Sequence, residues 1–378
     1  AGTGISEAEG KRLEAEFKGI LRDTPPFTSF PKLRANESVF FVEPELVAEV
    51  KFAEWTKENQ LRQASYKGLR TDKNAKEVRL EKTAPIEESI MENGKFEIKG
   101  VKISSPDKVI FETENITKLD VIRYYEQVAN RMLPYLSHRV LSIVRCPKGI
   151  SQSCFYKKHP GADNKGIVTI PIISSEGKTE EYFYIENETG LIYEAQMGTI
   201  EFHTWGSRVE AIENPDMMVF DLDPDEGMDI EQVRIGVMDI KSILEELSLK
   251  SYLKTSGGKG YHVVVPLKPT ATWEVINTFA RKIAEVMEQK RPDRHTSNVR
   301  KAKRAGKIFI DWIRNGRGAT SVAPYSLRAR KGASVSMPLS WAELNTVAPD
   351  EIGMSEALKR INGLDPWHDF FMNNQVIR

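Results

Sequence analysis

The stretch "MVFDLDPDEG" (218–227) runs an apolar segment directly into four carboxylates. On a strand, Asp221 and Asp223 lie on one face, with Cα atoms roughly 6–7 Å apart, while Leu222 points into the core. Carboxylates at this spacing repel one another, so a divalent cation is a favourable countercharge. Alone, a D-x-D pair is a weak signal that a plain strand-end turn would also explain. The remaining two acids, Asp225 and Glu226, read as solvated turn residues.

A third acid, Asp311, lies in the apolar segment "KIFIDWI" (307–313). Between Lys290 and Lys331 there are thirteen Lys/Arg against two Asp/Glu. Such a charge asymmetry is typical of a phosphate-binding surface, although a solvated surface run would look the same. Asp311 is therefore either a surface ion-pair residue or a metal ligand among phosphate-binding cations. Three carboxylates with phosphate and water would complete a Mg²⁺ or Mn²⁺ site, and two such cations suit phosphoryl transfer.

The segment "LKTSGGKGYHVVVPL" (253–267) offers groups for an anion. Its glycines free the backbone to direct N–H groups at phosphate, while Ser256 supplies a hydroxyl and Lys259 a cation. His262 follows at the start of an apolar strand. The order of residues is not that of a Walker A loop. The alternative is a simple glycine turn that enters a strand.

Two further segments carry candidate binding residues. "EFHTWGSR" (201–208) places His203 near a tryptophan, where a packing role is the alternative. "CFYKKHPG" (154–161) places Phe155 beside Tyr156. Adjacent aromatic residues on a strand cannot both face one core, so at least one is available to stack on a base, unless both are covered by a loop.

The composition bears on membrane segments, secretory signals and cysteine chemistry. The 378 residues carry 54 basic and 54 acidic side chains, and no apolar run approaches the length of a membrane helix or a secretory signal. Cys146 and Cys154 are eight residues apart without a neighbouring Cys or His pair, so we expect neither a zinc site nor a disulfide framework. Both are predicted to be ordinary thiols of a reducing cytosol.

The pattern of apolar residues predicts an α/β (α+β) protein with a mixed central sheet. A β-rich block at 1–82 is followed by a polar linker at 83–98 and a larger domain at 99–378. The expected helices cover 117–133, starting on a threonine cap, 229–247 and 272–290. The expected strands cover 140–145, 181–186, 216–222, 261–267 and 307–313.

The motif order h-h-D-h-D, S-x-x-x-x-x-H and h-D resembles the archaeo-eukaryotic primase superfamily. The segments "VRCPKGISQSCFYKKH", "EFHTWGSR", "KTSGGKGYHVVVPL" and "IDWIRNGRGATSVAPYSLRAR" resemble the polymerase domain of bacterial ligase D, over about residues 99–378. This resemblance implies a primase/polymerase-type mixed sheet with flanking helices.

The first block is similar to the C-terminal part of the OB domain of ATP-dependent ligases, a small partial β-barrel. Its R-x-D-K ending (70–73) resembles the last ligase motif. The K-x-D-G motif of the adenylated lysine is absent, so this piece is expected to be inactive as a ligase alone. The order of ligase before polymerase resembles Bacillus-like enzymes.

The resemblance implies a role for each matching residue. The catalytic metals, Mn²⁺ or Mg²⁺ in a two-metal site, would be bound by Asp221, Asp223 and Asp311. An incoming NTP or dNTP would be held by His203, Ser256, Lys259, His262 and Arg328. DNA would be bound by Lys108 and Lys118 at the 5′-phosphate of a gap, by Phe155 and Tyr156 through stacking, and by Arg304 near the template or primer end.

The resemblance also implies a function and partners. The chain would be a nucleotidyltransferase that extends 3′ ends of DNA at gaps and double-strand breaks in bacterial non-homologous end joining. Its partners would be DNA with a 5′-phosphate, a Ku-like end-binding protein and the ligase catalytic module of the same polypeptide, in the cytoplasm at the nucleoid and not at a membrane. Two alternatives are a haloacid-dehalogenase-like phosphohydrolase, because "VFDLDPDEG" resembles its D-x-D loop, and a non-catalytic DNA-end-binding module.

Overall fold

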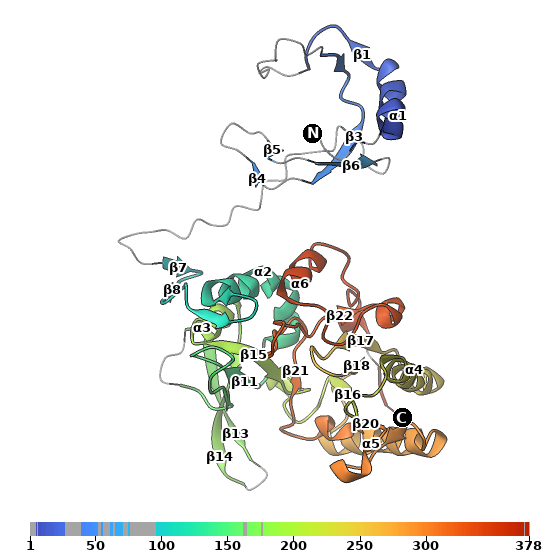
Figure 1. The fold of residues 1–378 in the computed structure, drawn as a ribbon. Coiled ribbons are helices and arrows are strands. Elements are labelled where there is room, and N and C mark those ends of the chain that lie inside the picture. The colour runs from blue at the N-terminus through green and yellow to red at the C-terminus, as the bar shows by residue number, and fades with distance from the viewer. Residues whose placement is uncertain are drawn as a thin grey trace. The chain divides into compact units, whose positions relative to one another are not determined.

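The computed structural model describes residues 5, 7–26, 39–51, 54–55, 61–62, 65–70, 75, 96–161, 165–174, 177–373 and 375–377. The chain divides into two compact units, residues 1–88 and 89–378, and each is described by itself (Figure 1). In the described residues, no helix combines the length and the apolar character that a bilayer crossing requires.

The first unit consists of one helix and short antiparallel strand pairs. Helix α1 (Glu7–Lys18) is tied to strand β6 (Ser65–Arg70) by a hydrogen bond of 2.8 Å from the Tyr66 hydroxyl to Glu9. The β-rich character expected for this block is confirmed, while α1 was not expected, and the described strands do not close a barrel. Of the R-x-D-K motif, 71–73 lie outside the described residues. The other strands are β1 (Leu21–Arg22), β2 (Phe41–Val42), β3 (Val47–Lys51), β4 (Glu54–Trp55) and β5 (Leu61–Arg62), paired β1–β2, β3–β6 and β4–β5.

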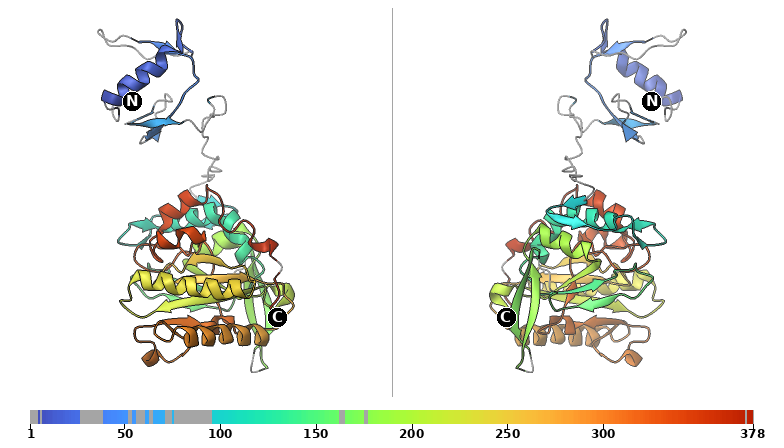
Figure 2. Two further views of the ribbon diagram at one scale, coloured as in Figure 1. Left: turned by 90° about the vertical axis from the view of Figure 1, so that its right-hand side faces the viewer. Right: turned by 90° about the vertical axis from the view of Figure 1, so that its left-hand side faces the viewer.

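The second unit is built around a six-stranded sheet in the order β19-β20-β16-β18-β17-β22. All its neighbouring strands are antiparallel except the parallel pair β19–β20. Helices α4 (Ile230–Glu246) and α5 (Trp273–Lys290) lie side by side against it (Figure 2). The strands are β16 (Met217–Pro224), β17 (Tyr252–Thr255), β18 (Tyr261–Pro266), β19 (His295–Thr296), β20 (Ile308–Asp311) and β22 (Pro338–Leu339).

A second sheet has the order β12-β11-β15-β21, and helices α2 (Lys118–Leu136) and α3 (Glu188–Gln196) pack against β15. The hairpin of β13 (Ile167–Ile173) and β14 (Thr179–Ile185) extends away from the body of this unit (Figure 1). The strands of the sheet are β11 (Leu141–Arg145), β12 (Phe155–Lys157), β15 (Thr199–Thr204) and β21 (Ser321–Val322).

Short elements complete the unit. Two small hairpins precede α2, and one-turn helices follow several strands. These elements are β7 (Phe96–Ile98), β8 (Val101–Ile103), β9 (Val109–Phe111), β10 (Ile116–Thr117), η2 (Val209–Ala211), η3 (Lys301–Lys303), η4 (Trp312–Asn315), η5 (Trp341–Asn345), α6 (Met354–Arg360) and η6 (Phe370–Met372).

One continuous apolar core joins the two sheets, and α2 connects them. Tyr124 and Tyr125 of this helix are completely buried, and their hydroxyls donate to the carbonyl oxygens of Tyr325 and Ile200. The Tyr125 hydroxyl also accepts a hydrogen bond of 3.1 Å from the Leu327 amide. Since a buried hydroxyl must be satisfied, these bonds fix the segment 325–327 against β15.

Most expected elements are present with small shifts at their ends. The threonine cap is confirmed, because Thr117 and Asp120 form a capping box at the start of α2. The strand expected at 307–313 ends at Asp311, whose carboxylate instead caps η4. Residues 96–98 of the expected linker form β7, while the rest of that linker lies outside the described residues.

The prediction of two free thiols is wrong, because Cys146 and Cys154 form a disulfide bond. Strands β11 and β12 pair antiparallel with Arg145 opposite Phe155, so Cys146, which follows β11, faces Cys154, which precedes β12. The two Cα atoms are 4.4 Å apart, within the range that a disulfide requires. The spacing in the sequence did not reveal this hairpin register.

Candidate active site

Four polar side chains form a row across the six-stranded sheet. The backbone register places Lys254 of β17 opposite His262 of β18, His262 opposite Asp221 of β16, and Asp221 opposite Asp311 of β20. His262 Nε2 lies 3.3 Å from Asp221 Oδ1. Residues that are directly opposite in antiparallel strands have Cβ atoms about 4.5–5.5 Å apart, so the sheet itself brings these groups together.

The expected alternation along β16 is confirmed. Leu222 is completely buried, whereas Asp221 is partly exposed and Asp223 is exposed. Burial alone would raise the pKa of Asp221, but the charge and hydrogen bond of His262 lower it. Burial and the charge of Asp221 raise the pKa of Asp223. The two acids therefore repel each other, as expected for carboxylates that share one site.

Asp311 has a similar environment. Burial raises its pKa, the charge of Arg314 opposes that rise, and the charge of Asp221 adds to it. The Arg314 Nε atom lies 3.1 Å from Asp311 Oδ2 and 3.5 Å from Asp221 Oδ2. Sequence reasoning missed Arg314, because the strand expected at 307–313 did not predict the turn η4 that brings this residue back to the acid.

Arg304 forms an ion pair with Asp223. Its Nη1 atom lies 3.7 Å from Asp223 Oδ2, and its guanidinium lies 3.5 Å from the centre of the Phe309 ring. Stacking on the ring holds the guanidinium beside the edge of the acid row. Arg304 directly follows the turn η3, which contains Lys301 and Lys303, within the basic stretch 290–331.

The donor chemistry of the row suits a hard divalent cation, because carboxylate oxygens on adjacent strands face one another. Among the residues that the structure describes, however, no three His, Cys, Asp or Glu side chains are arranged around a metal position. Arg314 instead supplies positive charge to Asp221 and Asp311 at once. A cation held by these acids would therefore take over a role that Arg314 fills here.

The loop between β17 and β18 is folded around the Ser256 hydroxyl. This hydroxyl accepts hydrogen bonds from the amides of Gly258 and Gly260 at 3.1 and 3.3 Å. Gly257 has a φ of +65°, and a Cβ at Gly260 would lie 1.9 Å from a backbone oxygen of β16. The glycine turn is thus required by the packing of the loop against the strand that carries the acids.

Two of the loop's predicted binding residues differ in exposure. Lys259 is exposed, and its Nζ atom lies 3.8 Å from Glu226. His262 is buried, and burial together with the charge of Lys254 lowers its pKa to about 4. Its Nδ1 atom is buried and has no hydrogen-bond partner among the described residues.

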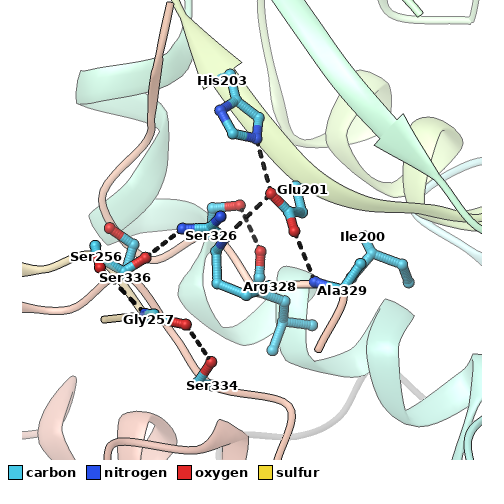
Figure 3. A network of polar contacts seen from close by, with 12 residues as sticks. Ile200, Glu201, His203, Ser256, Gly257, Ser326, Arg328, Ala329, Ser334 and Ser336 are labelled. Carbon is cyan, nitrogen blue, oxygen red and sulfur yellow. Dashed lines mark hydrogen bonds and ion pairs between the residues drawn. The ribbon is translucent and has the colours of Figure 1, made fainter. Parts of the chain in front are cut away.

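His203 and Arg328 are held by one carboxylate, Glu201, which sequence reasoning missed (Figure 3). His203 Nε2 lies 2.8 Å from Glu201 Oε2, and Arg328 Nε donates to the same oxygen at 3.0 Å. Arg328 Nη1 also donates to the carbonyl oxygen of Ser256. The contact between Glu201 and His203 could have been expected from the sequence, because residues 201 and 203 lie on the same face of a strand.

Lys108 and Lys118 form a separate cationic pair. The amide of Lys118 donates to the carbonyl oxygen of Lys108 at 2.7 Å, so β9 and α2 bring the two residues together. Their Nζ atoms donate to the carbonyl oxygens of Pro147 and Ser104 at 2.5 and 2.7 Å. Burial and the charge of Lys108 lower the pKa of Lys118 to about 8. Two lysines that repel each other in this way form a favourable anion site.

Phe155 and Tyr156 are both exposed, at 48% and 75% of their surfaces. Their strand, β12, lies at the edge of its sheet, and among the described strands it pairs with β11 alone. The Tyr156 ring centre lies 6.2 Å from that of His203. The expected exposure of at least one aromatic residue is therefore confirmed for both, and Tyr156 lies next to the His203 network. Stacking on a base stays a prediction.

Both units of the chain are similar to parts of known DNA-repair proteins. Residues 117–367 match the family described as LigD, primase-polymerase domain, and residues 1–73 match the ATP-dependent DNA ligase C-terminal region. The polymerase domain from Mycobacterium tuberculosis ligase D, solved in complex with DNA, is similar with a TM-score of 0.68 and 30% identity, over 73% of this chain and 99% of that one.

Two curated relatives show the extent of the similarity. The multifunctional non-homologous end joining protein LigD of Pseudomonas aeruginosa is 33% identical over 387 residues, which cover 100% of this chain and 46% of that protein. The bifunctional protein LigD of Bacillus subtilis is 29% identical over 280 residues, covering 73% of this chain and 45% of that protein. The chain thus spans less than half the length of these relatives.

Proposed function

The chain belongs to the LigD primase-polymerase family, and from this membership we propose that it is a nucleotidyltransferase that extends 3′ ends of DNA at gaps and double-strand breaks in bacterial non-homologous end joining. The observation that carries the proposal is the row of Asp221, His262 and Asp311 across adjacent strands, with Asp223 on the same face of β16. This row combines acids for cations with a nitrogen for phosphate.

In the proposed reaction the 3′-hydroxyl of a primer attacks the α-phosphate of an NTP or dNTP, and pyrophosphate leaves. Asp221, Asp223 and Asp311 would hold two divalent cations, Mn²⁺ or Mg²⁺, which supply charge neutralisation for the leaving group and a lowered pKa for the attacking hydroxyl. The protein's own contribution is to position the reactants and to stabilise negative charge.

The triphosphate would be bound from three segments. The loop between β17 and β18 contributes Ser256, Lys259 and His262, while β15 contributes His203 and the segment after β21 contributes Arg328. Contacts of His203 and Arg328 with Glu201, and of Arg328 with the Ser256 carbonyl oxygen, already join these segments. A site assembled before the nucleotide arrives needs little reorganisation during the reaction.

The DNA would be contacted outside the acid row. Lys108 and Lys118 offer two adjacent cations for a 5′-phosphate at the far side of a gap, and Phe155 with Tyr156 offers exposed rings on which a base can stack. Arg304, beside Asp223, would meet the template or primer end. Several phosphates would be neutralised together, so binding should weaken steeply as salt rises.

The partners and the compartment also belong to the proposal. We expect a Ku-like end-binding protein to recruit the chain, and a ligase catalytic module of the same polypeptide to seal the extended end. The ligase-like residues 1–73 contain no K-x-D-G motif, so ligation would depend on residues outside this sequence. The proposed compartment is the bacterial cytoplasm at the nucleoid.

The two alternatives receive less support. A haloacid-dehalogenase-like phosphohydrolase would need a further acidic pair late in the chain, whereas Asp311 is accompanied by Arg314 and Arg304. A non-catalytic DNA-end-binding module would have no use for Asp221 and Asp311 aligned on adjacent strands. Neither alternative agrees with the family match.

The test is single-nucleotide addition to a gapped duplex with a 5′-phosphate, in Mn²⁺, with either the four NTPs or the four dNTPs. An Asp221→Ala/Asp223→Ala variant is the control. Templated extension by the wild type and not by the variant would support a polymerase and report its sugar preference. Tight DNA binding without extension would favour the end-binding module, and phosphate release from simple esters would favour the phosphohydrolase.

A further inference from the structure

Glu201 is a buried carboxylate at the centre of the nucleotide-binding groups (Figure 3). Its side chain uses both oxygens: Oε2 contacts His203 Nε2 and Arg328 Nε, and Oε1 accepts a hydrogen bond of 2.8 Å from the Ala329 amide. Burial alone would raise the pKa of Glu201, but the hydrogen bond from His203 and the charge of Arg328 lower it to about 2. The carboxylate is thus ionised at neutral pH and fully occupied.

The contacts of Glu201 join three parts of the chain that are distant in sequence. His203 lies on the same strand, β15, while Arg328 and Ala329 come from the segment after β21. Arg328 extends the connection to the carbonyl oxygen of Ser256. The same region is reinforced by the Ser326 hydroxyl, which accepts a hydrogen bond of 2.9 Å from the Phe202 amide.

Resting on the proposed function, we propose that Glu201 is a positioning residue for nucleotidyl transfer, which orients His203 and Arg328 toward the triphosphate. With Nε2 donating to Glu201, the free nitrogen of His203 is Nδ1, which donates to a phosphate oxygen when the imidazole is protonated, the charged form that Glu201 stabilises. With Nε and Nη1 held by Glu201 and Ser256, Arg328 keeps Nη2, which has no hydrogen-bond partner in the described part of the chain. Each residue therefore presents one defined nitrogen to a ligand.

The negative charge of Glu201 shows that its proposed role is to orient His203 and Arg328 and not to attract the triphosphate. A carboxylate beside two phosphate-binding groups lowers the net positive charge of the pocket, so it does not increase the attraction for a triphosphate. Its benefit lies in fixing a flexible arginine and an imidazole before the nucleotide arrives. Loss of Glu201 should therefore lower the rate of the chemical step more than the affinity for the nucleotide.

The primary test is Glu201→Gln, because an amide keeps the shape of the side chain but places a donor where Glu201 has only acceptors. At least one of the contacts to His203, Arg328 or the Ala329 amide is then lost. We expect kcat for single-nucleotide addition to fall by at least about tenfold, while KM for the nucleotide changes by less than about threefold.

A matched control is available on α4. Asp239 contacts His295 Nε2 at 3.1 Å and also pairs with Arg294, so it reproduces the combination of carboxylate, histidine and arginine away from the nucleotide groups. We expect Asp239→Asn to lower thermal stability without the split between kcat and KM. Equal losses of kcat in Asp239→Asn and Glu201→Gln, at equal melting temperatures, would overturn the proposal.

A second variant keeps the inference testable if Glu201→Gln does not fold. Arg328→Lys retains the positive charge but lacks the planar fork that reaches Glu201 and the Ser256 carbonyl oxygen together. We expect its kcat to fall about as far as that of Arg328→Ala. Near wild-type kcat in Arg328→Lys would show that charge alone suffices and would overturn the role of Glu201.

Failure of this inference is distinct from failure of the proposed function. If the wild type adds no nucleotide, the polymerase assignment is lost, and the inference falls with it. If the wild type is active and Glu201→Gln retains its kcat, only the positioning role is lost. If Glu201→Gln loses nucleotide addition and DNA binding equally, together with a lower melting temperature, Glu201 has a merely structural role and the inference is wrong.

Discussion

Recognition of a 5′-phosphate should depend on pH in a way that identifies Lys118. Burial and the charge of Lys108 lower the pKa of Lys118 to about 8, from a model-peptide value of 10.5. A phosphate monoester is a dianion above pH 6–7, so its charge is constant over the relevant range. Only protonated Lys118 attracts it, and the affinity for a 5′-phosphate should therefore decrease as pH rises through 8.

The magnitude follows from this pKa. If the bound phosphate keeps Lys118 protonated, the dissociation constant is multiplied by one plus the ratio of neutral to charged lysine in the free protein. That factor is about 1.1 at pH 7 and about 11 at pH 9, so affinity should fall about tenfold. Removing Lys108 takes away one cause of the lowered pKa and should move this transition to higher pH.

The assay is fluorescence anisotropy on gapped duplexes that differ only in a 5′-phosphate or a 5′-hydroxyl, from pH 6.5 to 9.5. The ratio of the two dissociation constants removes any general effect of pH on DNA binding. Lys118→Arg is the matched variant, since arginine stays protonated throughout and should give a flat ratio. A flat ratio in the wild type, or the same slope in Lys118→Arg, would refute the reasoning.

Three further outcomes are expected from the site. Asp311→Ala should reduce nucleotide addition at least about a hundredfold, as Asp221→Ala should, because both acids belong to one row. Near wild-type primer extension by Asp311→Ala would remove Asp311 from the metal-binding acids. Replacing both aromatic residues of β12 by alanine should weaken DNA binding by about 1–3 kcal/mol per stacked base with little change in melting temperature, because both are exposed; equal affinity in anisotropy measurements would remove the stacking role. Gly260→Ala should lower the free energy of unfolding of this unit by about 1–3 kcal/mol, because the added Cβ would lie 1.9 Å from a backbone oxygen. Gly161→Ala should leave this free energy unchanged, because its Cβ would meet only the tip of a flexible lysine at 3.6 Å. Denaturant unfolding of both variants measures the difference.

Sequence reasoning succeeded where a residue's role depends on its own strand. The alternation of Asp221, Leu222 and Asp223 followed from strand geometry, and the exposure of at least one of Phe155 and Tyr156 followed from two aromatic residues being adjacent. The three long helices could be predicted from local apolar periodicity, and the cap of α2 could be predicted from its threonine. These features require no knowledge of which strands pair.

Sequence reasoning failed where the role of a residue depends on the register between strands or on the folding of a loop. That Lys254 lies opposite His262, or that Cys146 lies opposite Cys154, depends on hairpin pairing that no local pattern encodes. Glu201 and Arg328 are 127 residues apart in sequence, so their ion pair could not be anticipated. The second sheet was largely missed for a different reason: β12 and β15 are short and partly polar, so no apolar pattern marks them as strands.

The row of side chains across β17, β18, β16 and β20 determines where this chain tolerates changes in length. Deleting or inserting one residue within any of these four strands would turn its side chain to the opposite face and remove it from the row. The length of the segments that contain α4, α5 and η3 is not constrained by the register, because these segments connect the strands without pairing in the sheet. Related chains should therefore keep constant spacing within these strands and differ in length in the connections that contain α4 and α5. A functional insertion, such as a fluorescent tag, belongs in one of these two connections and not in the loop between β17 and β18.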